Sequence, residues 1–89
     1  LEGGLGVDTL NGGNGIDTAT YATSNAGVTV SLTSGTGTGG HAQGDILTQI
    51  ENLIGSGLDD TLTGSASANL LDGGAGNDTL SGLAGTDLL

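Results

Sequence analysis

The chain has 89 residues, with ten Asp plus Glu against no Lys or Arg, so its formal net charge is −10 at neutral pH. Without a basic residue it cannot neutralise nucleic-acid phosphates or bind an anionic membrane by charge, and no apolar run is long enough to cross a bilayer. The absence of Cys, Phe, Trp and Met excludes disulfides, thiolate metal sites and a core of large side chains. The carboxylates have no counter-charge within the chain, which leaves a dissolved cation to supply it.

Residues 1–20 hold the end of one repeat and then two copies of a nonapeptide, "GGLGVDTLN" and "GGNGIDTAT". Both copies read Gly-Gly-x-Gly-x-Asp-x-apolar-x, with Asp8 and Asp17 at the acid position. The Gly-rich part predicts a tight turn, because glycine adopts positive φ without a steric penalty. The last three residues of each copy fit a short strand whose middle side chain points inward.

Residues 21–45 interrupt the repeat and change its register. "VTVSL" alternates Val28, Val30 and Leu32 with polar residues, which is the pattern of a half-buried strand. We expect the following "TSGTGTGGHAQG" to be a flexible polar turn region. "GGHAQGDIL" reads as a nonapeptide turn with one inserted residue, so the whole segment is interpreted as a spacer within the solenoid, with Asp45 at the acid position.

Residues 46–89 return to the nine-residue period, first in degenerate copies and then in regular ones. Leu occupies five positions that are nine residues apart, at Leu53, Leu62, Leu71, Leu80 and Leu89. The acid positions of the same repeats are Glu51, Asp60, Asn69, Asp78 and Asp87. A turn and a strand repeated at this period predict an all-β solenoid, in which two nonapeptides make one flattened coil and the leucines form two inward ladders. The turn of Asp60 should then stack on that of Asp78, and the turn of Asn69 on that of Asp87.

The expected core is too small to hold this fold by itself. Glycine-rich turns lose much conformational entropy when they become ordered, and stacked acid turns repel one another. Calcium between stacked turns offsets both effects, because Ca²⁺ accepts carboxylate and carbonyl oxygens in flexible geometry. The sequence therefore predicts calcium as a cofactor and a fold that depends on it.

The copies at residues 3–11, 12–20 and 73–81 resemble the RTX, or haemolysin-type, calcium-binding nonapeptide GGxGxDxUx. This resemblance implies a parallel β-roll with calcium between stacked glycine-rich turns, type I secretion, and folding after export. Carried over by position, the acid ligands are Asp8, Asp17, Asp78 and Asp87, with Asp60 at the same place in a degenerate copy and Asp45 and Asn69 as further candidates. The turns would add backbone carbonyls from Gly3, Gly4, Gly6, Gly12, Gly13, Gly15, Gly73, Gly74, Gly76, Gly82 and Gly85.

Other readings of these residues are weaker. An acidic flexible linker would not keep leucines in strict register. His41 stands alone, without the Cys or second His that a zinc site needs, and is expected to be a solvated loop residue. Asp59 and Asp60 are neighbouring carboxylates without a nucleophile or basic partner, so no enzyme activity is expected. Tyr21 is expected to pack at a strand, and no EF-hand loop occurs.

Three classes of function remain open. The favoured class is a calcium-dependent structural module of a secreted or cell-surface bacterial protein, such as an adhesin, surface-layer or filament component. The second is the accessory module of a secreted protease, lipase or alginate epimerase. The third is an ice- or carbohydrate-binding module, which a flat, regular Thr array would favour. The expected partners are calcium ions and either adjoining repeats or subunits stacked end to end; nucleic acid and membrane insertion are not expected.

Overall fold

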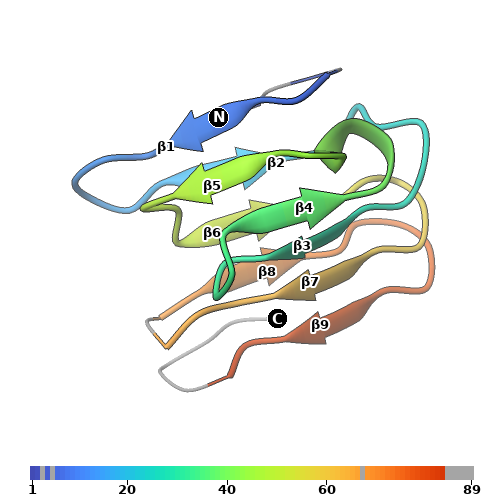
Figure 1. Cartoon of the computed structure of the whole chain (residues 1–89). Coiled ribbons are helices and arrows are strands. Elements are labelled where there is room, and N and C mark those ends of the chain that lie inside the picture. The colour runs from blue at the N-terminus through green and yellow to red at the C-terminus, as the bar shows by residue number, and fades with distance from the viewer. Residues whose placement is uncertain (3, 5, 67, 84–89) are drawn as a thin grey trace.

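In a computed structural model, described for residues 1–83 apart from residues 3, 5 and 67, the chain winds into a flattened solenoid of two sheets (Figure 1). Sheet A has six strands in the order β1-β5-β4-β3-β7-β9, and sheet B has three in the order β2-β6-β8. Each strand spans three residues: β1 Thr9–Asn11, β2 Thr18–Thr20, β3 Thr29–Ser31, β4 Thr36–Thr38, β5 Ile46–Thr48, β6 Asn52–Ile54, β7 Thr61–Thr63, β8 Leu70–Asp72 and β9 Thr79–Ser81. A 3₁₀ helix, η1, covers Gly40–Ala42. Within the described residues, no helix has the length and hydropathy needed to span a bilayer.

The pairing of the strands confirms the predicted coil of two nonapeptides. β7 pairs with β9 in parallel, with Leu62 opposite Leu80, and β6 pairs with β8, with Leu53 opposite Leu71. Alternate repeats therefore share a sheet, and the turns that precede β7 and β9 stack as expected. The first coil joins the same sheets, because β1 pairs with β5 and β2 pairs with β6 in parallel.

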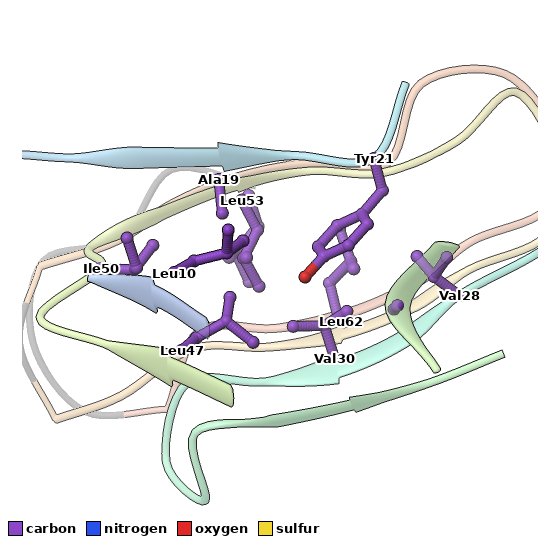
Figure 2. Close-up of a cluster of buried hydrophobic side chains, with 11 residues drawn as sticks. Leu10, Ala19, Tyr21, Val28, Val30, Leu47, Ile50, Leu53 and Leu62 are labelled. Carbon is purple, nitrogen blue, oxygen red and sulfur yellow. The ribbon is translucent and has the colours of Figure 1, made fainter. Parts of the chain in front are cut away.

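The core lies between the two sheets and is built from the middle residue of each strand (Figure 2). The buried strand residues are Leu10, Ala19, Val30, Leu47, Leu53, Leu62 and Leu71. Leu80 packs against this cluster but is only partly buried, and Leu89 lies outside the described residues. Figure 2 also shows Tyr21 reaching from the end of β2 into the interior, which confirms its predicted packing role.

The spacer differs from its prediction in one respect. The strand over Val28 and Val30 is present as β3, but the polar stretch after it is not a mere flexible turn: it forms β4 and η1. β4 runs antiparallel to both β3 and β5 and lies between them. Its middle residue, Gly37, is buried, and a Cβ there would lie 3.0 Å from Cβ of Ala42. A neighbour thus fills the space of the missing side chain, so β4 shows no apolar alternation in the sequence.

Candidate metal centre

The glycines at the second and fourth positions of the regular turns are required by their backbone conformation. Gly74 and Gly76 have φ of 71° and 92°, and Gly13 and Gly15 have φ of 75° and 91°. Side-chain-bearing residues rarely adopt this left-handed region. The near-identical angles show that turns 12–17 and 73–78 have one repeated shape.

The first glycine of each regular turn makes room for the acid of the same turn. A Cβ on Gly73 would lie 2.4 Å from Oδ2 of Asp78, and a Cβ on Gly12 would lie 2.7 Å from Oδ2 of Asp17. The carboxylate therefore lies directly against the turn backbone. Each of the three motif positions is therefore glycine for a structural reason. Together the glycines bring the acid and the turn backbone into contact.

Acid positions in neighbouring coils are joined by hydrogen bonds from backbone to side chain. The N–H of Asp60 donates to Oδ1 of Asp78 at 2.8 Å, and the N–H of Asp17 donates to Oε1 of Glu51 at 2.8 Å. A third bond of this kind, at 2.9 Å, runs from the N–H of Asp8 to Asp45. One oxygen each of Asp78, Glu51 and Asp45 is therefore used for stacking coil on coil, which brings the like charges of successive coils into line.

Two predicted ligands, Asp8 and Asp17, take part in this stacking through their backbone N–H. Oδ2 of Asp8 and Oδ2 of Asp17 are buried without a hydrogen-bond partner in the described part of the chain. A buried carboxylate oxygen without a partner is costly, and a cation is the partner that offsets its charge. Carboxylate and carbonyl oxygens are the ligands that Ca²⁺ prefers, so these residues fit calcium.

The protein side chains alone do not form a cage. Among the described residues, no three His, Cys, Asp or Glu side chains come together as a metal-binding group. A bound ion would therefore take most of its ligands from backbone carbonyls. Of the predicted turn glycines, Gly4, Gly6, Gly12, Gly13, Gly15, Gly73, Gly74 and Gly76 lie in the regular turns, and Gly82 follows β9. Gly3, Gly85 and Asp87 lie outside the described residues.

The remaining acid-position candidates are buried and hydrogen-bonded. Asp45 is 1% exposed and accepts a bond of 3.1 Å from the Tyr21 hydroxyl at Oδ2. Asp60 is 3% exposed, and both of its oxygens accept hydrogen bonds. Asn69 is buried and donates to the carbonyl of Glu51 at 2.7 Å.

The bond between Tyr21 and Asp45 is a polar contact that sequence reasoning missed. Burial raises the pKa of the Tyr21 phenol far above its usual range, and the neighbouring carboxylate of Asp45 raises it further. The residues are 24 positions apart, and only the fold brings them together. His41, expected to be a solvated loop residue, lies in η1 and is half-buried, with Nδ1 buried and unpartnered within the described residues.

A family profile described as the RTX calcium-binding nonapeptide repeat matches four copies in the chain, over residues 1–19 and 54–89. The match covers more than half of the sequence. The chain belongs to the RTX calcium-binding nonapeptide repeat family. RTX nonapeptides bind calcium ions, so calcium is the cofactor, and the two sheets, which are parallel apart from β4, are the expected β-roll. The unmatched stretch contains the spacer and the first degenerate repeat, where the RTX motif is lost. No curated protein matches the chain.

Proposed function

We propose that this RTX module is a structural part of a larger secreted or cell-surface protein, and that it folds when calcium binds. The observation that carries the proposal is the charge of the turns. The chain has ten carboxylates and no Lys or Arg, and Oδ2 of Asp8 and Asp17 is buried without a partner in the described residues. An ion that binds only the folded turns stabilises the folded state by mass action.

In this proposal Asp8, Asp17, Asp78 and Asp87 are the acid ligands, and the carbonyls of the turn glycines complete the shell. Asp78 is supported by its contact with Gly73 and by the stacking of its turn on the turn before β7. Adjoining repeats, or a second roll stacked end to end, would supply turns to the outermost ions. The protein would reach calcium-rich surroundings by type I secretion.

Catalysis is not part of the proposal. Asp59 is exposed and accepts the N–H of Asn77 at 2.7 Å, whereas Asp60 is buried. The two neighbouring carboxylates therefore do not face one another as an acid–base pair would. If the module belongs to a secreted enzyme, the enzyme's chemistry lies in another domain.

Calorimetric titration of the 89-residue chain with calcium tests the proposal. Asp78→Ala should lower calcium affinity strongly, and the control change Asp59→Asn, which keeps an oxygen for the N–H of Asn77, should leave it nearly unchanged, because Asp59 lies outside the acid position. Magnesium should bind poorly, since it demands tight octahedral geometry and holds its waters. Equal effects of the two variants, or no calcium binding by the wild type, would contradict the proposal.

A second candidate function is supported by the outer face of sheet A. On four adjacent strands, β4, β3, β7 and β9, the middle residue faces the core, and both flanking residues are Thr or Ser. The register aligns them in two rows, Thr38–Thr29–Thr61–Thr79 and Thr36–Ser31–Thr63–Ser81. Neighbouring strands lie about 4.8 Å apart. The rows carry no charged residue in a chain of charge −10.

Such a hydroxyl array favours an ice-binding surface over a carbohydrate-binding one. The chain's single aromatic residue, Tyr21, is buried, so no ring is available to stack on a sugar. Wild-type protein in calcium should then inhibit ice recrystallisation. Thr61→Lys should abolish the effect, and Leu70→Lys, on the exposed face of sheet B, should not. A wild type without any effect on ice growth removes this candidate.

A further inference from the structure

The turns of this β-roll divide into two kinds according to where the N–H of their second residue points. In turn 73–78 the N–H of Gly74 donates to Oδ1 of Asp72 at 2.9 Å. In turn 12–17 the N–H of Gly13 donates to Oδ1 of Asn11 at 3.0 Å. In these two turns the residue before the Gly-Gly pair accepts this N–H, so the turn does not use it on its own acid.

In turn 55–60 the same position is Ser56, and it bonds to the acid instead. Its N–H donates to Oδ2 of Asp60 at 2.9 Å, and its hydroxyl donates to Oδ1 at 2.7 Å. The N–H of Val28, from the spacer, adds a bond of 2.8 Å to Oδ1. Both oxygens of this buried carboxylate are therefore satisfied without a cation. Bonds to an ionised carboxylate are stronger than neutral ones, so they stabilise its charge well.

Turn 64–69 repeats this arrangement with a neutral side chain. The N–H of Ser65 donates to Oδ1 of Asn69 at 2.9 Å, and Nδ2 of Asn69 donates to the carbonyl of Glu51 and to Oγ of Ser65. An amide nitrogen occupies the place of the second carboxylate oxygen. The side chain of Asn69 has no charge, and its amide nitrogen has no lone pair to offer a cation.

The residues flanking the turns explain the difference. Asn11 and Asp72 precede the Gly-Gly turns, whereas Ile54 and Thr63 precede turns 55–60 and 64–69. Ile54 has no side-chain oxygen to accept the N–H of the second residue, and the N–H of Ser65 donates to Asn69 and not to the hydroxyl of Thr63. Ser56 also lacks positive φ, which among the described non-glycine residues occurs only at Gln49 and Leu83. The Gly-Ser turns therefore have a different backbone path.

We infer that turns 55–60 and 64–69 are closed without calcium, and that Ser56 and Ser65 determine which turns of the roll bind the ion. The inference rests on the proposed function, because it assigns calcium to the Gly-Gly turns alone. A cation at Asp60 would have to compete with three hydrogen bonds inside a buried turn. Asp60 is thus a structural residue of the roll, and turns 55–60 and 64–69 stack without a metal of their own.

One substitution made in two turns tests the inference. Asp78→Asn should reduce the number of calcium ions bound per chain, measured by equilibrium dialysis. Asp60→Asn should leave that number unchanged. It should lower the melting temperature in saturating calcium, because an amide nitrogen would then face an N–H donor. Loss of an ion in Asp60→Asn overturns the inference but not the proposed function, whereas absence of binding in the wild type overturns the proposed function.

A gain-of-binding variant tests the same point in the opposite direction. Ile54→Asp, Ser56→Gly and Leu58→Gly together would give turn 55–60 the features of a Gly-Gly turn. This triple variant should bind more calcium than the wild type and depend more on it for folding. Ser56→Ala is the matched control, since it removes the hydroxyl bond and should lower stability without adding an ion. An unchanged calcium count in the folded triple variant overturns the inference.

Discussion

The repeats and the spacer contribute to the same two-sheet roll by opposite means. The spacer, residues 21–45, contains a single acidic residue, Asp45 at its end, and the other nine of the ten Asp and Glu lie in the repeats. The spacer nevertheless supplies some of the most deeply buried side chains, Tyr21, Val28, Val30 and Ala42, each at most 1% exposed. A solenoid can therefore be continued by ordinary packing where no charge accumulates. Where acid turns stack on one another, it needs a counter-ion.

The junction of the two regions shows how an uncharged strand replaces an acid repeat. Val28 stands where a repeat has its acid, one residue before the strand. Its N–H donates to Asp60, and its carbonyl accepts the N–H of Thr61 at 2.9 Å. A Cβ on Gly27 would lie 2.0 Å from the carbonyl oxygen of Asp59, so only glycine allows this close approach. The backbone pairing of the roll continues here although the acid is lost.

Removal of calcium should reveal the largest difference between the repeats and the spacer. In chelator the β signal in circular dichroism should fall, and millimolar calcium should restore it. Hydrogen exchange should show β1, β2 and β9 losing protection at a higher calcium concentration than β3 and β7, because their turns are of the Gly-Gly kind. If all strands lost protection at the same calcium concentration, the repeats and the spacer would form one cooperative unit. If the chain were folded equally well without calcium, the prediction that folding depends on calcium would be wrong.

Truncation of a ladder leucine should have the next largest effect. Leu62 is fully buried where β7 meets β3 of the spacer, so Leu62→Ala should lower the free energy of unfolding by about 2–5 kcal/mol. Leu80→Ala should cost less, because Leu80 is only partly buried. Equal losses, measured by urea denaturation in saturating calcium, would show that Leu80 is covered in solution.

Loss of the Tyr21 hydroxyl should have a smaller effect. Tyr21→Phe keeps the ring in the core but leaves Oδ2 of Asp45 buried without this donor. An unsatisfied buried acceptor costs about 1–3 kcal/mol, and more when it is charged. Thermal unfolding in saturating calcium measures the difference. A variant as stable as the wild type would mean that water reaches Asp45.

Alkaline pH should weaken the same contact, with no effect near neutrality. The pKa of Tyr21 is raised in the folded state, whereas an unfolded Tyr titrates at about 10. Below that pH the phenol is neutral in both states and its contribution is complete. Above it the unfolded state releases the proton first, so stability falls as pH rises. Tyr21→Phe should lack this added loss in a pH series of melting temperatures.

The sequence predicted the features that repeat and missed those that occur once. The nine-residue spacing predicted the strands, the inward leucines and the stacking of Asp60 on Asp78, because each follows from a period. β4 escaped prediction because its buried residue is Gly37, whose partner Ala42 fills the space from a neighbouring segment. The closure of turn 55–60 by Ser56 had a signal, a Ser at the second position four residues before the acid. The role of this Ser depends on the direction of its backbone N–H, which donates to Asp60, and only the structure shows that direction.

The spacer also affects the order in which coils can form. Bonds between the last coils join residues 18 apart, as from Asp60 to Asp78, whereas the first coil closes over 37 residues, from Asp8 to Asp45. Doubling a loop raises its closure entropy by about 0.6 kcal/mol. Short-range contacts also form faster than long-range ones. The C-terminal coils should therefore nucleate first, and the N-terminal pair of repeats should add to a spacer that has already folded onto them.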